Sequence, residues 1–206
     1  MTTLAQAQSI LAHDLLGTDE VARRLGIRFT AEQKAHLEEI PFPERVLVEA
    51  GGAHILIASA PVSLLDLRAG PAGHLLYPNR NAWYEKLKFA GERADVRWYL
   101  MRKGIIPGSL DKTFDEQRAA APGYEVPSAC ELVLGVLVYY LATGVRLLDA
   151  GLLARCRDRV QQYGSVVDGG VNVGKFEDRG LSIETLWLNY RLHYLGVAGS
   201  RKLPSS

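Results

Sequence analysis

The side chains best suited to chemistry lie near the carboxyl end of the chain, and their types favour binding. Tyr163, Trp187, Tyr190 and Tyr194 stand among Asn, Ser and His residues. Tyrosine and tryptophan offer large, rigid contact surfaces with few torsions to freeze, and the polar types add adaptable hydrogen bonds. We expect Trp187 to be buried and to anchor the segment while its neighbours stay exposed. The mixture predicts a recognition surface.

The sequence lacks the residue patterns on which several classes of enzyme depend. No glycine-rich phosphate loop with its lysine is present, and no serine or cysteine has the context of a nucleophile elbow. The histidines are scattered, with no pair at helical metal spacing, and each is expected to be packed or solvated: His13, His36, His54, His74 and His193. We therefore expect no acyl transfer, phosphoryl transfer or metal-dependent hydrolysis, no cofactor and no metal.

Three carboxylates near the carboxyl end, Asp168, Glu177 and Asp178, lie in predicted turns. Carboxylate oxygens could bind Ca²⁺, but the spacing is not that of a helix-loop-helix calcium site. Asp is also an ordinary residue of tight turns. Solvated turn residues are the favoured interpretation.

Composition restricts the partners. The chain has 206 residues, and its 24 basic and 23 acidic residues give a net charge of +1, which does not favour nucleic acid or an anionic membrane as the main partner. Its two cysteines are too few for a disulfide framework, so we expect two buried free thiols. No secretory signal is recognisable, and the most apolar run, 132–142, is shorter than the roughly 20 residues of a membrane span. A cytoplasmic protein is the default expectation, with surface display left open.

The elements that must position the recognition residues begin with short helices. Thr3 with Gln6 and Thr30 with Gln33 have capping-box spacing, in which the hydroxyl and the amide each satisfy a free backbone N–H group. We expect a helical annex over residues 1–52. It is either packed on the following domain or a separate module.

The remaining chain, 53–206, predicts a mixed domain. The run 54–59 is apolar and typical of a buried strand. The segment 96–103 alternates, which predicts a strand with one face in a core. Ser128 and Glu131 open a helix that is apolar nearly all round and therefore buried on most sides. From residue 152 onward, strand-like runs alternate with glycine-rich turns, so the fold class expected is α+β.

Six motifs of the second half occur in an order that resembles a known family: TGVRLL (143–148), ARCRD (154–158), VNVGKF (171–176), RGL (179–181), Trp187 and LGVAGSRK (195–202). The chain resembles the variable proteins diversified by diversity-generating retroelements, of the type encoded in candidate-phylum bacteria and related metagenomes. The resemblance spans residues 83–202 in motif order and is most specific over 143–202.

The resemblance implies a C-type-lectin-like fold that displays altered side chains on a fixed backbone. In that family, a reverse transcriptase copies a template with errors at adenines and the copy replaces the 3′ end of the gene. The implied framework positions are Gly174, Phe176, Gly180, Trp187, Leu195, Gly196, Ser200 and Arg201. The implied diversified, ligand-binding positions are Asn172, Lys175, Ser182, Glu184, Leu188, Asn189, Tyr190, Leu192, His193 and Tyr194, with Arg157, Arg159 and Tyr163 as upstream additions.

The expected function is non-enzymatic recognition of a protein or glycan ligand. A DNA-binding regulator is the alternative, because residues 18–40 have the outline of a helix-turn-helix. Its second helix carries Glu32, Glu38 and Glu39, which would be repelled by phosphates. An enzyme of the formylglycine-generating type, which shares the lectin-like fold, is the third reading. It is disfavoured because no reactive cysteine pair lies near the proposed surface.

Overall fold

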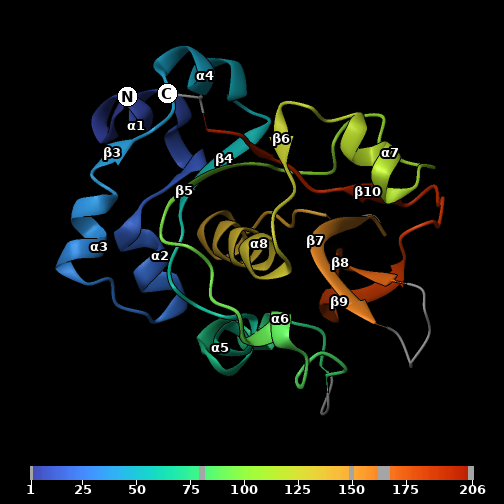
Figure 1. Cartoon of the computed structure of the whole chain (residues 1–206). Helices are drawn as coiled ribbons and strands as arrows, with labels where there is room; N and C mark the ends of the chain where they lie inside the picture. Colours follow the sequence, from blue (N-terminus) through green and yellow to red (C-terminus); the bar gives the residue numbers. More distant parts are fainter. Residues whose placement is uncertain (1, 79–81, 149–150, 162–167, 204–206) are drawn as a thin grey trace.

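The computed structural model describes residues 2–78, 82–148, 151–161 and 168–203, and its elements surround one central helix, α8 (Ala129–Thr143) (Figure 1). The Ser128 hydroxyl accepts from the Glu131 amide at 3.2 Å and the Glu131 carboxylate accepts from the Ser128 amide at 2.7 Å. Gly144 ends the helix with a φ of 74°, a left-handed conformation that glycine adopts without strain. The predicted helix and its caps are therefore confirmed. No helix in the described part of the chain is both long and apolar enough to cross a membrane.

A five-stranded sheet lies along one side of α8. Its order is β2-β4-β5-β11-β6; β2 and β4 are parallel and the other neighbours are antiparallel. The strands are β2 (Leu15–Leu16), β4 (His54–Ala58), β5 (Trp98–Arg102), β11 (Ser200–Arg201) and β6 (Tyr124–Glu125).

Both faces of this sheet are buried. Ile55 and Ile57 join the core around α8, whereas Leu56 and Leu100 join a second core with the N-terminal helices. The expectation that 96–103 has only one face in a core was wrong. Alternation within one strand could not show that helices from the other end of the chain cover its second face.

The N-terminal part packs on the sheet. It comprises the pair β1 (Thr2–Thr3) and β3 (Glu39–Ile40), the 3₁₀ turn η1 (Ala12–Asp14), strand β2, and the helices α1 (Leu4–Leu11), α2 (Thr18–Leu25), α3 (Ala31–His36) and α4 (Glu44–Ala50). α2 contacts α8, and β2 is a strand of the central sheet. The segments on either side of residue 52 thus share both hydrophobic cores.

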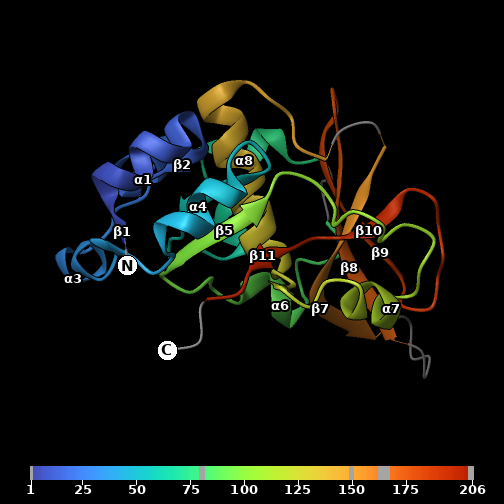
Figure 2. The ribbon, with the colours of Figure 1, turned by 90° about the horizontal axis from the view of Figure 1, so that it is seen from above.

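A four-stranded sheet lies at the opposite side of the molecule from the N-terminal helices (Figure 2). Its order is β10-β7-β8-β9, formed by β10 (Leu195–Val197), β7 (Leu153–Gln161), β8 (Asp168–Glu177) and β9 (Gly180–Trp187). One face packs on α8 through residues such as Val171 and Val173. Cys130 in α8 and Cys156 in β7 are both free and buried, as predicted.

Short helices complete the cover of the two sheets. They are α5 (Leu64–Ala69), the 3₁₀ helix η2 (Pro71–Leu75), α6 (Lys88–Gly91) and α7 (Phe114–Ala119). Together the sheets and helices show the predicted α+β class. The element that matters most for the carboxyl-terminal residues is α7, because it lies against the chain that follows β9.

Candidate binding surface

The loop of residues 188–194, which joins β9 to β10, is held by a buried arginine that lies outside it. The Arg155 side chain projects from β7 and is completely buried. Its guanidinium donates to the carbonyl oxygens of Trp187 at 3.2 Å and Tyr190 at 2.7 Å, and to Gln117 Oε1 at 2.9 Å. Burial lowers the pKa of Arg155 to about 10, so the group is still charged at neutral pH and donates strong hydrogen bonds.

Backbone donors from the α7 region hold two further carbonyls of the loop. The Phe114 amide donates to the Leu188 carbonyl at 2.9 Å, and the Asp111 amide donates to the Leu192 carbonyl at 3.2 Å. Main-chain acceptors are present whatever the side chain. The path of the loop is therefore determined largely by donors outside it.

Most side chains of the 188–194 loop reach solvent. Asn189, Tyr190 and His193 are exposed, Tyr190 by 42%, and Leu192 and Tyr194 are partly exposed. Leu188 differs, because it packs on a small core containing Phe114 and supports the loop from below. Arg191 pairs with Glu116 at 2.6 Å across an exposed surface.

The hairpin of β8 and β9 continues this surface. Lys175 Nζ lies 3.1 Å from Glu184 Oε1 and 5.5 Å from the centre of the Tyr194 ring, which joins the hairpin to the loop. Ser182 and Glu184 also line a cavity of about 570 Å³ beside the edge of β9. Trp83 lines the cavity and donates from Nε1 to the Ile183 carbonyl at 2.9 Å.

The expected framework positions, apart from Trp187 and Arg201, are buried: Gly174, Phe176, Gly180, Leu195, Gly196 and Ser200. Gly174 has a φ of 158°, and a Cβ there would lie 2.1 Å from the Leu152 carbonyl oxygen. A Cβ at Gly180, where φ is 107°, would lie 2.7 Å from the Leu75 oxygen. Both positions therefore require glycine to bring β8 and β9 against their neighbours.

No family model, curated protein or solved structure matches this chain. The helices and sheets establish the α+β class. The C-type-lectin-like fold and membership of the retroelement family stay predictions, which the residues and their geometry must support.

Asn172 and Trp187 differ from their prediction in burial. Asn172 is completely buried in the middle strand of the four-stranded sheet, where its side-chain amide donates to the Gly170 carbonyl at 2.8 Å. The resemblance implies a diversified, ligand-binding position, but in the register of the sheet Asn172 lies between Arg155 of β7 and Glu184 of β9 and is buried there. Trp187 is only partly buried, because the last residue of β9 lies at the rim of the sheet. Tyr163 lies outside the described residues.

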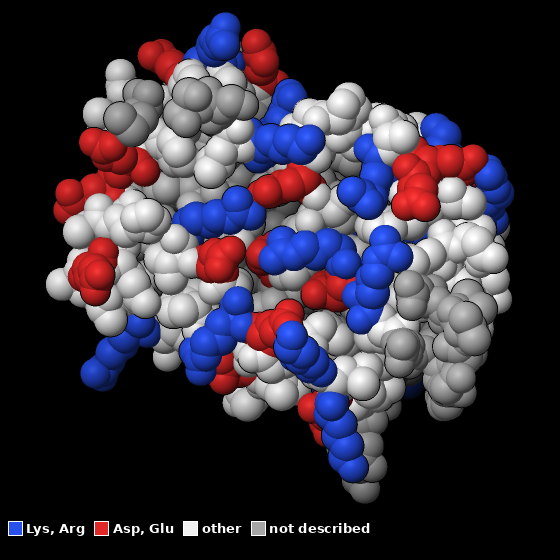
Figure 3. Space-filling model, viewed as in Figure 1, with Lys and Arg blue, Asp and Glu red and all other residues white. Residues whose placement is uncertain are grey.

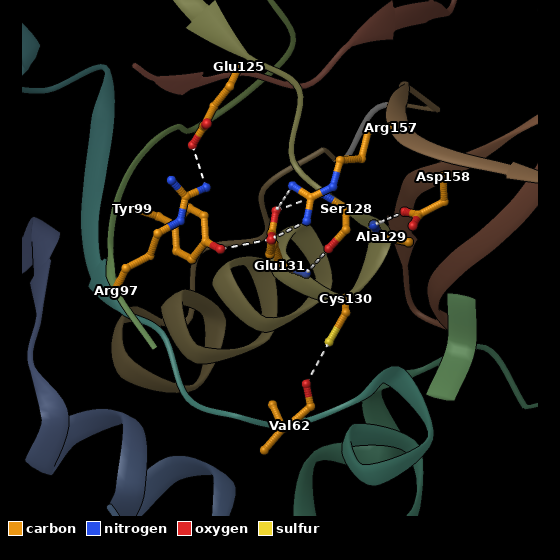
Figure 4. Close-up of polar contacts among 10 residues, drawn as sticks. All are labelled: Val62, Arg97, Tyr99, Glu125, Ser128, Ala129, Cys130, Glu131, Arg157 and Asp158. Carbon is orange, nitrogen blue, oxygen red and sulfur yellow. Dashed lines mark hydrogen bonds and ion pairs between the residues drawn. The ribbon is translucent and has the colours of Figure 1, made fainter. Parts of the chain in front are cut away.

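Arg157 belongs to a different part of the molecule, the amino end of α8 (Figure 4). It donates twice to the Glu131 carboxylate, at 2.7 and 2.8 Å, and the Tyr99 hydroxyl donates to the same group at 2.8 Å. Glu131 is 1% exposed, and burial raises the pKa of Tyr99, which keeps the phenol protonated. We call Tyr99, Glu131 and Arg157 the α8 cap cluster. Its side chains hold one another and are not available for variation.

The other expected ligands have ordinary surroundings. Among the described residues, no group of three or more His, Cys, Asp or Glu side chains has the geometry to hold a metal ion. Glu177 and Asp178 are exposed, and Asp178 pairs with Arg146 at 2.8 Å. In the segment considered for DNA binding, α3 has six residues and no buried side chain. That geometry does not favour a recognition helix, which must be held firmly on its own domain.

Two buried residues that support the 188–194 loop, Arg155 and Gln117, were not predicted from the sequence. Arg155 was noted only as part of the ARCRD motif, although Ala154 and Cys156 on either side are apolar and face α8. Strand alternation places Arg155 on the opposite face, towards the segment after β9. Gln117 was missed because it gave no local signal, yet its amide donates to the carbonyls of Ser109 at 2.7 Å and Leu195 at 2.9 Å.

Proposed function

We propose that this protein binds a protein or glycan ligand through the 188–194 loop and the adjoining β8–β9 hairpin, without catalysis. The observation that carries the proposal is the separation of main chain from side chain in the loop. Four carbonyls, at residues 187, 188, 190 and 192, accept from Arg155 or from the α7 region. A loop held in this way can change its exposed side chains without changing its path.

The exposed side chains have the chemistry of a binding surface. Tyr190 and Tyr194 supply aromatic area, and Asn189, Ser182 and His193 supply donors and acceptors. A few aromatic anchors typically contribute most of the binding energy, and the contacts around them exclude water. The cavity of about 570 Å³ beside Ser182 and Glu184 would receive a protruding side chain or sugar of the ligand.

We further propose that the protein is a variable protein of a diversity-generating retroelement with a C-type-lectin-like fold. The motif order supports this proposal, and so does the burial of most of the implied framework positions. Asn172 is removed from the proposed binding residues because it is buried, and Arg157 because it is held by Glu131. Genomic sequence provides one test. The encoding locus should carry, beside a reverse transcriptase gene, a near-copy of the last hundred or so bases whose mismatches fall at adenines.

A pair of matched libraries tests the binding function itself. The first library randomises exposed and partly exposed positions: Ser182, Glu184, Asn189, Tyr190, His193 and Tyr194. The second randomises the same number of supporting positions: Phe114, Gln117, Arg155, Asn172, Leu195 and Ser200. Protease resistance of displayed variants should show most members of the first library folded and few of the second, and binders to a panel of proteins and glycans should come from the first. Equal loss of folded members in the two libraries would contradict the proposal.

A further inference from the structure

Lys175 lines two neighbouring cavities. The first is the cavity of about 570 Å³ beside the edge of β9, and the second, of about 540 Å³, is lined by Gly151, Leu152, His193 and Tyr194 as well. Small-molecule sites typically have volumes of about 300–1,000 Å³, so each cavity can take one unit of a ligand. Because one side chain lines both cavities, a ligand that fills both must pass Lys175.

The backbone of β8 directs Lys175 to this junction. The register between β8 and β9 shifts between Gly174 and Glu177, and Lys175 has a φ of 48°, which is uncommon for a residue with a side chain. A bulge of this kind redirects the side chain that it carries. Lys175 Nζ lies 3.1 Å from the Glu184 carboxylate and 5.5 Å from the centre of the Tyr194 ring. Unfavourable backbone conformations of this type concentrate at functional sites.

The charges that line the two cavities balance one another. Two ion pairs neutralise lining residues, with N–O distances of 3.1 and 3.6 Å: Lys175 with Glu184, and Arg68 with Glu85. The other described carboxylate and guanidinium groups of the lining, Glu177 and Arg179, carry opposite charges. On the face drawn in Figure 3, basic and acidic side chains likewise alternate in a band across the middle of the molecule. A lining without excess charge suits an uncharged ligand.

Each cavity also offers aromatic surface. Trp83 lines the first, and its indole is fixed by the bond to the Ile183 carbonyl and by the Tyr84 ring, which it meets edge-on at 5.6 Å between ring centres. Tyr194 lines the second, and the His193 ring meets it edge-on at 5.2 Å. Rings that are already held in place bury apolar surface of a ligand with little loss of entropy.

We propose that the two cavities form one groove for a linear, uncharged oligosaccharide, with Lys175 as the central contact. This inference rests on the binding function proposed above and names the class of ligand. Sugar rings pack their apolar C–H faces against Trp83 and Tyr194 in the two cavities. Lys175 donates to sugar hydroxyls and Glu184 accepts from them, and such charge-assisted hydrogen bonds are stronger than neutral ones.

An extended peptide suits this groove less well than a sugar does. A peptide binds beside a strand by pairing with the N–H and C=O groups of its edge. At the edge of β9, the Leu181 carbonyl accepts from the Tyr77 amide at 3.0 Å. The Ile183 carbonyl accepts from Trp83 Nε1 at 2.9 Å. A peptide strand would have to displace both donors, whereas a sugar needs only side-chain donors and acceptors.

The test measures, by titration calorimetry, the binding of three uncharged hexasaccharides to the full chain: cellohexaose, maltohexaose and mannohexaose. The corresponding disaccharides and a hexapeptide of alternating serine and glycine are the comparison probes. K175N removes the ammonium group and introduces a residue type that tolerates left-handed backbone. K34N is the matched control, because Lys34 is also an exposed lysine in an ion pair, with Asp19 at 2.9 Å, on the opposite side of the molecule (Figure 2). E184Q removes the accepting charge and keeps the shape of the side chain.

We expect a hexasaccharide to bind about tenfold or more tighter than its disaccharide, because it fills both cavities. K175N and E184Q should each weaken its binding about fivefold or more, while K34N leaves it unchanged. K175N should leave the midpoint of thermal unfolding unchanged or raise it, because asparagine adopts a φ of 48° more readily than lysine does. If K175N lowers the midpoint or fails to fold, E184Q decides the outcome.

The proposal is overturned if none of the three hexasaccharides binds, or if a hexasaccharide binds no more tightly than its disaccharide. Equal effects of K175N and K34N, unchanged binding by E184Q, or tighter binding of the hexapeptide than of the sugars would also overturn it. Any of these results leaves the proposed binding function in place if the library of exposed positions yields protein binders. Equal loss of folded members in the two libraries would instead remove the binding function itself.

Discussion

The 188–194 loop and the amino end of α8 both depend on a buried ionised side chain, but they use it in opposite ways. In the loop, buried Arg155 binds main-chain carbonyls, so the side chains of the loop take little part in fixing its path. At α8, buried Glu131 binds side chains, the phenol of Tyr99 and the guanidinium of Arg157. The first arrangement leaves residue types free to change. The second requires each partner to keep its type.

This difference explains why residues that look alike in the sequence have different roles. Arg155, Arg157 and Arg159 follow one another at alternate positions of one strand. Arg155 is fully buried and holds the loop, Arg157 holds the α8 cap cluster, and Arg159 is exposed beside the Phe114 ring. The three arginines differ in role because each contacts a different part of the chain, far away in the sequence.

The largest expected effect comes from removing the guanidinium that holds the loop. Arg155→Leu removes the guanidinium from four acceptors: the carbonyls of Lys112, Trp187 and Tyr190 and the side-chain oxygen of Gln117. The Trp187 carbonyl keeps a bond from the Tyr190 amide at 3.1 Å, and an acceptor left unsatisfied in a buried place costs about 1–3 kcal/mol. We expect the free energy of unfolding to fall by about 4 kcal/mol in a denaturant titration. Arg159→Leu, at an exposed position of the same strand, should lower it much less, because the Arg159 side chain is exposed whereas that of Arg155 is buried. Equal effects of the two substitutions would contradict the role given to Arg155.

Low pH should destabilise the five-stranded sheet rather than the 188–194 loop, because it protonates His54 of β4. This ring is buried between the Ala50 carbonyl, at 3.1 Å, and the Tyr124 hydroxyl, at 3.0 Å, and burial lowers its pKa to about 4. Because the unfolded chain binds the proton more readily, His54 contributes stability that is complete above pH 6.5 and is lost as the pH falls to about 4.

The measurement is the free energy of unfolding as a function of pH. We expect the contribution of His54 to fall by at most about 1.4 kcal/mol per pH unit across that window, or about 3 kcal/mol in total. The His54→Gln variant should lack this component of the slope. An unchanged slope in that variant would show that other groups produce the acid sensitivity.

A smaller effect is expected at the α8 cap cluster. Glu131→Gln keeps the shape of the side chain but removes the charge that binds Arg157. We expect a loss of about 2 kcal/mol, because hydrogen bonds to charged groups contribute about 1.5–3 kcal/mol and Arg157 is half exposed, which weakens the pair. A double-mutant cycle with Arg157→Gln measures the coupling. Additive losses would show that the two residues act independently.

Substitution of Trp187, at the rim of the four-stranded sheet, should lower the free energy of unfolding still less. Trp187 is only partly buried, so Trp187→Ala should cost about 1–2 kcal/mol, well below the 3–5 kcal/mol of a fully buried aromatic residue. Thermal unfolding provides the measurement, with Phe176→Ala as the comparison, since Phe176 is 2% exposed and packs edge-on against Tyr140. A larger loss for Trp187→Ala than for Phe176→Ala would place Trp187 in the core, as the sequence first suggested.

Local signals in the sequence were reliable. The capping boxes at Thr3, Thr30 and Ser128 are all present, because each depends on residues three positions apart. The α+β class followed from the change between helical and strand periods. Predicted exposure was also correct for Asn189 and Tyr190, which occupy a connection between strands.

The structural features that the sequence did not predict depend on contacts between residues far apart in the chain. The partners of Arg155 lie 32 to 43 residues away in the chain, so no local pattern reveals them. Asn172 has the residue type of a surface position, but it is buried in the middle of a sheet whose pairing joins it to residues 155 and 184. The second buried face of β5 depends on α1 and α4, which lie much earlier in the chain.

The smallest expected effect tests the central claim most directly. A triple variant, Asn189→Ser with Tyr190→Ala and His193→Ala, changes three exposed side chains of the 188–194 loop. Hydrogen exchange of the Phe114 and Asp111 amides, the two backbone donors to the loop, reports whether its path survives. We predict unchanged protection of both amides and a change in the free energy of unfolding below about 0.5 kcal/mol per substitution. Loss of protection at these two amides would show that the side chains determine the loop, and would contradict its role as a fixed support for variable residues.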